Sequence, residues 1–243
     1  MGRTQLPPGA NLALPPLARS ALIMMVLTGG LWLAMLLLLY LKEAWLIAFL
    51  NLAALSPEMV ASGYLYQLAT YMFLHELSSP LHLLLNALLV YFFATPIESR
   101  WGVRKTLLFA FGGGVAGGLM VLLFAAVAAL FSLGTPAMTI GFSGAALAML
   151  ALFCTLNANA TILLFFVVPI RARTILILAV AIDFLMWIAP GAQVSFPAHL
   201  GGILFGVLIG WGGPRHLWRK FRYRRILRDV SLDRRPKKRQ WLN

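Results

Sequence analysis

The chain has few charged residues, very few acidic residues and almost no cysteine. Asp, Glu, Lys and Arg make up 11% of its 243 residues, 7 of these are Asp or Glu, and the mean hydropathy is +0.86. Soluble globular domains carry about 25% charged residues. This composition therefore excludes a soluble globular domain and indicates a polytopic membrane protein. Cys154 is the single cysteine. It excludes an intrachain disulfide and a zinc site built from cysteines, and it leaves the redox compartment undetermined.

Six apolar runs approach the roughly 20 residues that a helix needs to cross a bilayer. They are residues 20–41, 81–97, 104–131, 142–157, 174–190 and 197–212, of which the fourth and sixth are short. The first run is too long for the apolar part of a signal peptide and no small-residue cleavage site follows it. We therefore expect an all-α, six-helix membrane domain over residues 20–212, preceded by a cytoplasmic segment (1–19) and followed by a basic cytoplasmic tail (213–243).

The connection between the first two runs, residues 42–80, is too apolar for a free linker, and Pro57 and Gly63 interrupt it. We expect a partly re-entrant or interfacial segment with short amphipathic helices. Lys and Arg cluster before the first run, in alternate connections and in the tail, whereas the opposite connections contain Lys42 as their only cation. This asymmetry predicts that both termini are cytoplasmic, in a multi-pass protein of the cell (plasma or inner) membrane.

The net charge of +13 would favour nucleic acid binding in a soluble protein. Here 12 of the cations lie within residues 213–243, directly after an apolar run and interleaved with aromatic and aliphatic residues. This mixture is typical of an interfacial segment on an anionic membrane leaflet. We therefore expect the lipid bilayer, and no nucleic acid, as the partner of the tail.

Polar residues are costly inside a bilayer, and four of them stand near the starts of the apolar runs. His82 and Asn86 are one helical turn apart in the second run, Ser143 opens the fourth, and His199 opens the sixth. Each has an ordinary explanation, because serine is a common helix start, His and Asn bond across helices, and histidine is common at interfaces. The topology places all four at the same, non-cytoplasmic end, whereas independent structural roles would scatter over both ends.

One chemistry accounts for the set. A serine hydroxyl becomes a nucleophile when an adjacent imidazole accepts its proton, and acyl transfer also needs donors for the developing oxyanion. Ser143 and His199 fit the first requirement, and His82 and Asn86 fit the second.

A strip of glycines explains how the two helices of this serine and histidine could approach each other. The strip consists of Gly202, Gly206 and Gly210. We expect it to pack on the face of the fourth helix that carries Gly144 and Ala148, which would bring hydroxyl and imidazole within hydrogen-bond reach. Gly141 permits a backbone geometry in which main-chain N–H groups and the positive helix end face the reacting carbonyl.

The motifs around these residues resemble the rhomboid family of intramembrane serine proteases over about residues 60–212. "GFSG" is similar to the family's G-x-S-G motif, and "AHLGG" is similar to its A-H-x-x-G motif. "HLLLN" resembles H-x-x-x-N in the second span, and "ESRWG", with Glu98 and Arg100, resembles the structural E-x-R-x-G signature. The four motifs occur in the right order and on the right spans.

The resemblance implies a Ser-His dyad without an acidic third member, in a water-filled cavity below the outer membrane surface. Ser143 is then the nucleophile, His199 the base, and His82 and Asn86 stabilise the oxyanion. The implied activity is cleavage of transmembrane protein substrates, and we expect no cofactor and no metal.

Three positions depart from the family pattern. Tyr66-Gln67 stands where many members have Trp-Arg, which predicts a different anchoring of the first loop. Leu147 replaces a tyrosine that often stacks on the catalytic histidine, so the imidazole could be held more loosely. Asp183 is an acid in the fifth run. We interpret it as a buried, hydrogen-bonded or protonated structural residue and not as a third catalytic member, because it lies well inside a different span.

Alternatives from other classes stay open. An inactive rhomboid relative would bind transmembrane clients without cutting them, although such relatives usually lack the serine or the histidine. A channel or transporter would need ionisable groups at mid-membrane, where Asp183 is the one candidate. A metal site from His75, His82 and His199 is disfavoured because no carboxylate is expected at matching depth.

Overall fold

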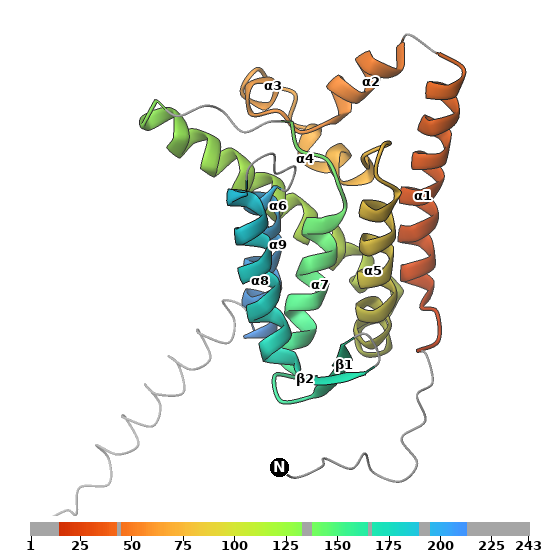
Figure 1. The fold of residues 1–243 in the computed structure, drawn as a ribbon, viewed down its shortest axis with the longest axis vertical. Coiled ribbons are helices and arrows are strands. Elements are labelled where there is room, and N and C mark those ends of the chain that lie inside the picture. The colour runs from red at the N-terminus through yellow and green to blue at the C-terminus, as the bar shows by residue number, and fades with distance from the viewer. Residues whose placement is uncertain (1–14, 43–44, 133–137, 165–166, 190–194, 213–243) are drawn as a thin grey trace, which may run out of the picture.

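The computed structural model describes residues 15–42, 45–132, 138–164, 167–189 and 195–212. The six longest helices of this part follow the six apolar runs, and shorter helices occupy the first connection (Figure 1). The long helices are α1 (Arg19–Tyr40), α5 (Pro80–Trp101), α6 (Val103–Leu130), α7 (Ser143–Leu156), α8 (Ala172–Ile188) and α9 (Phe196–Gly210). The first connection contains α2 (Trp45–Ala53), α3 (Pro57–Ala61), α4 (Gln67–Thr70) and the 3-10 turn η1 (Tyr71–Phe73).

The helices have the lengths and surfaces of a membrane protein. Among the described residues, α1, α5 and α6 are long and apolar enough to cross a bilayer, whereas α7 and α9 are shorter apolar helices of 14 and 15 residues. Large apolar side chains such as Leu33, Leu84 and Ile177 are each at least 60% exposed, as contact with lipid tails requires. The expectation of a helical polytopic membrane protein is confirmed.

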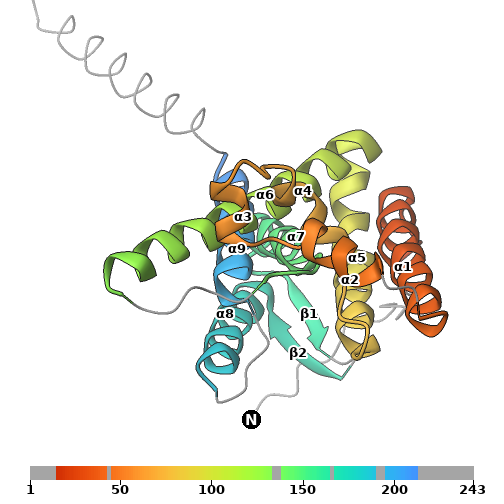
Figure 2. The same ribbon diagram turned by 90° about the horizontal axis from the view of Figure 1, so that it is seen from above.

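Helix α7 lies at the centre of the bundle, with α5, α6 and α9 packed around it (Figures 1 and 2). α1 lies outside α5, and α8 lies on the opposite side of the bundle, next to α9 (Figure 2). Most side chains of α7 are buried. Of the described side chains of α8, only Ala172 is buried. Ser143 therefore begins the best-packed helix, whereas α8 is a peripheral one.

The glycine strip of α9 packs on α7 as the sequence predicts. A Cβ atom at Gly202 would overlap the carbonyl of Gly144, and one at Gly206 would overlap the carbonyl of Ala148. On the other side of α9, a Cβ at Gly201 would lie 2.7 Å from the Cβ of Met120 on α6. These approaches are open only to residues without a side chain, so the glycines bring the three backbones together.

Backbone hydrogen bonds join the first connection to the segment that precedes α7. Leu55 and Thr139 exchange two backbone hydrogen bonds of 3.0 and 2.9 Å. Within the connection, the hydroxyl of Ser56 accepts a hydrogen bond of 3.5 Å from the N–H of Met59 at the start of α3. The expected short helices are therefore present, and they support the end of the bundle at which Ser143 lies.

At the other end of the bundle, α1 begins beside the end of α5. The Glu98 carboxylate accepts hydrogen bonds from the backbone N–H groups of Arg19 (3.3 Å) and Ser20 (2.7 Å). It thereby satisfies free donors at the start of α1, which is the structural role that the resemblance implies. Gly102 then turns the chain into α6 with a φ of 77°.

A two-stranded antiparallel sheet was not predicted. Strands β1 (Thr161–Leu164) and β2 (Val168–Arg171) pair between α7 and α8, at the end of the bundle opposite to Ser143 (Figure 1). The basic tail, residues 1–14 of the N-terminal segment, residues 133–137 between α6 and α7, and residues 190–194 between α8 and α9 lie outside the described residues.

Candidate active site

Ser143 is the first residue of α7 and is 9% exposed. Phe142 takes the N-cap position and no side chain caps this helix, so the serine hydroxyl is not used as a cap. The preceding Gly141 has a φ of 122°, a region that only glycine enters readily, and its N–H donates to the carbonyl of Tyr71 (3.0 Å). The tight turn at Gly141 therefore leaves the hydroxyl of Ser143 free to contact another helix.

That contact is made by His199, in the first turn of α9. Nε2 of His199 lies 2.6 Å from Oγ of Ser143, which is a short hydrogen bond. The imidazole is 14% exposed, so the protein shields most of it. The glycine strip below it lets the helices approach closely enough for this contact. The contact has the geometry that a serine nucleophile and an imidazole base would need for acyl transfer.

Asp183 of α8 contacts the other nitrogen of the same ring. Its Oδ1 lies 2.6 Å from Nδ1 of His199. The expectation that Asp183 is hydrogen-bonded is confirmed, but the argument that its depth separates it from the histidine is wrong. α8 ends at Ile188 and the antiparallel α9 begins at Phe196, so a residue near the end of α8 lies level with one near the start of α9.

His82 and Asn86 lie on the side of Ser143 that faces α5. A Cβ atom at Gly141 would be 3.1 Å from Cε1 of His82 and 3.7 Å from Oγ of Ser143, so the His82 ring and the hydroxyl both flank Gly141. Asn86 is 4% exposed, and its amide Nδ2 donates a hydrogen bond of 3.3 Å to Nε2 of His75. The structure thus gathers all the site residues expected from the sequence at one end of the bundle.

His75 is a member of this cluster that the sequence analysis considered only as a metal ligand. It is 1% exposed, and its Nε2 also accepts a hydrogen bond of 3.4 Å from the N–H of Phe142. Burial, with a smaller effect of the nearby His82, lowers the pKa of His75 to about 4. The neutral ring therefore links Asn86 to the turn before Ser143. Among the described residues, no three His, Cys, Asp or Glu side chains are placed to hold a metal ion.

Comparison with known proteins gives the family. The model of the Rhomboid domain matches residues 62–216, which is more than half of the chain. The chain belongs to the rhomboid family. It is 33% identical over 136 residues to "Rhomboid protein 1, mitochondrial" of Saccharomyces cerevisiae, covering 54% of this chain and 37% of that protein. It is 31% identical over 160 residues to "Rhomboid-like protease 3" of Toxoplasma gondii, covering 65% of this chain and 54% of that protein.

The chain therefore spans about a third to a half of the length of these curated rhomboids. The matched region includes every residue of the site, from His75 to His199.

The departures from the rhomboid pattern have structural explanations. Gln67 is fully buried, its amide donates to the carbonyl of Leu52 (2.9 Å), and its Oε1 accepts from the N–H of Ser56 (3.0 Å). Gln67 therefore anchors the first loop of this rhomboid by backbone hydrogen bonds. Leu147 packs in an apolar cluster with Leu150 on α7 and with side chains of α8.

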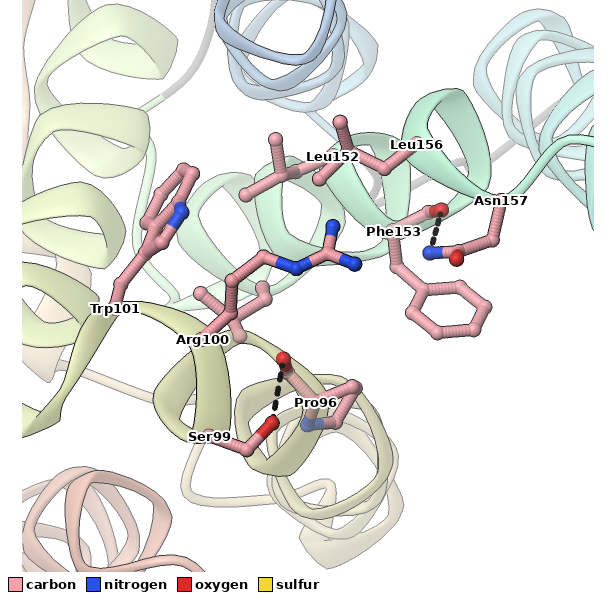
Figure 3. A pocket seen from close by; sticks show the side chains of 9 residues that line it. Pro96, Ser99, Arg100, Trp101, Leu152, Phe153, Leu156 and Asn157 are labelled. Atoms are coloured by element: carbon pink, nitrogen blue, oxygen red, sulfur yellow. Dashed lines mark hydrogen bonds between the residues drawn. The ribbon is translucent and has the colours of Figure 1, made fainter.

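A separate cavity of about 210 Å³ lies at the opposite end of α7 (Figure 3). It is lined by Arg100, whose guanidinium extends between α5 and α7, and by the last turn of α7 (Figure 3). Because Ser143 starts α7 and this cavity adjoins its end at Leu156, the cavity is not part of the serine and histidine site of the rhomboid.

Proposed function

We propose that this rhomboid is an intramembrane serine endopeptidase that cleaves transmembrane proteins. The observation that carries the proposal is the hydrogen bond of 2.6 Å between Oγ of Ser143 and Nε2 of His199. A chain that served only as a binding protein would have no need of an activated serine at the start of its most buried helix.

The length of α7 supports a site that lies within the membrane. α7 has 14 residues and is therefore about 21 Å long, whereas the hydrocarbon core is about 30 Å thick. If the end of α7 reaches one membrane face, Ser143 lies below the other. A scissile bond in a transmembrane segment would then meet the nucleophile inside the bilayer, with water entering from the near side.

The reaction follows the usual steps of acyl transfer. Oγ of Ser143 adds to the scissile carbonyl carbon and its proton passes to Nε2 of His199. The C–N bond then breaks, and the imidazolium returns that proton to the leaving amine. Water, deprotonated by the same imidazole, hydrolyses the acyl-serine ester. No cofactor takes part in these steps.

His82 and Asn86 are proposed to stabilise the oxyanion, together with main-chain N–H groups at the start of α7. The His82 ring flanks Gly141, so a donor from this ring could reach an oxygen bound next to Ser143. Asn86 is tied to the same turn through His75. Both residues would act by hydrogen bonding and would form no covalent bond.

For the arrangement in the cell, we propose six spans, formed by the long helices, with both termini in the cytoplasm and the basic tail on the anionic leaflet. The proposed domains are residues 1–19, 20–212 and 213–243. The membrane is proposed to be the cell membrane. The name of the yeast relative assigns that protein to mitochondria, so fractionation of the native host is the test that separates the two membranes.

The proposal is tested by incubating the purified chain, in liposomes, with a panel of tagged single-span substrates. The wild type and Ser99→Ala should cleave at least one of them, and Ser143→Ala should cleave none. Ser99 is a fair control because, among the described residues, its hydroxyl bonds only its own helix, at the carbonyl of Pro96 (3.0 Å). Folded wild-type chain that binds the panel without cutting it would instead support an inactive, client-binding rhomboid.

A further inference from the structure

We propose that Asp183 is a positioning residue for His199, so that the site works as a triad of serine, histidine and aspartate. This inference rests on the proposed function. The three groups are linked in series, because Oγ of Ser143 meets Nε2 of the imidazole and Oδ1 of Asp183 meets Nδ1, both at 2.6 Å. A carboxylate on Nδ1 holds the proton there and leaves Nε2 unprotonated, which is the tautomer that can accept the proton of the serine.

The carboxylate is held in place by an aromatic cluster that joins α8 to α9. The ring of Phe184, the neighbour of Asp183, lies 5.4 Å from that of Phe196, and Trp187 stacks on Phe196 at 5.5 Å. Phe196 precedes His199 by three residues on α9. Aromatic contacts therefore fix the two helix segments that bear the aspartate and the histidine.

The hydrogen bonding of Asp183 fits a role directed at the histidine better than a role in helix packing. Its side chain is 12% exposed, and Oδ2 has no hydrogen-bond partner among the described residues. A buried carboxylate retained only for packing would be expected to have both oxygens satisfied. The one described partner of Asp183 is the imidazole.

Leu147 explains why His199 would need Asp183 to orient its ring. Rhomboids often place a tyrosine there, stacked on the catalytic histidine, but Leu147 of this chain packs with Leu150, Ile175 and other apolar side chains. A leucine has no aromatic face or hydroxyl with which to orient the ring. In this chain the orientation of His199 is instead supplied by a hydrogen bond from the neighbouring helix.

Nitrogen NMR of the purified chain tests the inference without any substrate. The chain has four histidines, so the signals of ¹⁵N-labelled imidazoles can be assigned by comparison with His199→Gln. In the neutral form of the ring, His199 of the wild type should carry its proton on Nδ1. In Asp183→Asn the amide donates to Nδ1, and the proton should move to Nε2. A wild-type ring protonated on Nε2 would overturn the inference, whether or not any variant folds.

Kinetics provide the second readout. Loss of the corresponding aspartate in a serine, histidine and aspartate triad lowers kcat by about 10⁴-fold, and we expect a fall of about 10²- to 10⁴-fold in Asp183→Asn with KM little changed. Glu58→Gln, which removes an exposed carboxylate of the first loop, should keep full activity. Equal kcat in Asp183→Asn and wild type would refute the positioning role. If wild type itself is inactive, the proposed function fails, whereas the NMR result still decides the placement of the proton.

Discussion

Adding a side chain to the glycine strip should both destabilise the protein and separate the catalytic groups. A Cβ atom at Gly206 would overlap the carbonyl of Ala148 and lie 2.9 Å from Cβ of Ala151 and 3.0 Å from N of Leu152. Ordinary contact begins at 3.4 Å, so α9 must withdraw from α7 by at least 0.5 Å at Ala151. Overpacking of this kind costs about 1–3 kcal/mol, and Gly206→Leu should reach or exceed the upper figure.

The withdrawal should also lengthen the contact between Ser143 and His199, since both lie on the helices that separate. A displacement of 1 Å at a reacting centre can cost about 10²-fold in rate, so kcat should fall together with the melting temperature. Gly30→Leu on α1 is the matched control, because no atom lies within 4 Å of a Cβ added at Gly30. Thermal unfolding and substrate cleavage in one detergent measure both effects. Unchanged stability in Gly206→Leu would refute the close packing of α7 on α9.

Three further predictions concern other parts of the molecule. Asn86→Ala should cleave about 10²- to 10³-fold more slowly while remaining folded, as loss of an oxyanion donor does, and wild-type kinetics would reassign the residue to packing. The fold lowers the pKa of His75 from 6.5 to about 4, so as the pH falls the histidine is protonated in the unfolded chain before it is protonated in the folded protein. The free energy of unfolding should therefore fall by about 3 kcal/mol between pH 6.5 and pH 4. His75→Gln should abolish this dependence in acid melts, and an equally steep loss in that variant would contradict the assignment. Truncation after Arg219 should leave cleavage in detergent intact and weaken the binding of the tail to anionic vesicles in a salt-dependent way, and loss of cleavage by a folded protein would show that the tail belongs to the core.

The sequence predicts the helices well because an apolar run that could cross a bilayer has few other stable conformations. The grouping of Ser143, His199 and His82 was also predictable, since alternate helices of a membrane bundle begin at the same end. The spacing of Gly202 and Gly206 indicated a face that packs on another helix, and the structure places α7 against it.

Contacts made between elements were harder to predict. Asp183 was interpreted as distant from His199 because it was counted along its own span, whereas the end of one antiparallel helix lies level with the start of the next. Asp183 lies five residues before the end of α8 and His199 lies three residues after the start of α9. Counted from the connection between these helices, the two residues are at nearly the same level, which predicts their contact. The strands at 161–164 and 168–171 have no alternating polar pattern to indicate them. The roles of Gln67 and His75 rest on hydrogen bonds to backbone groups of other segments, and composition and spacing do not reveal such bonds.

The central claim, that His199 activates Ser143, is tested most directly by a serine-directed fluorophosphonate. Oγ of the activated serine should displace fluoride from phosphorus, and mass spectrometry of the digested protein should locate the adduct on Ser143 in the wild type and in Ser99→Ala. His199→Ala, folded to the same melting temperature, should remain unlabelled, as should Ser143→Ala. Labelling at Ser143 that is equally fast without the imidazole of His199 would contradict the account.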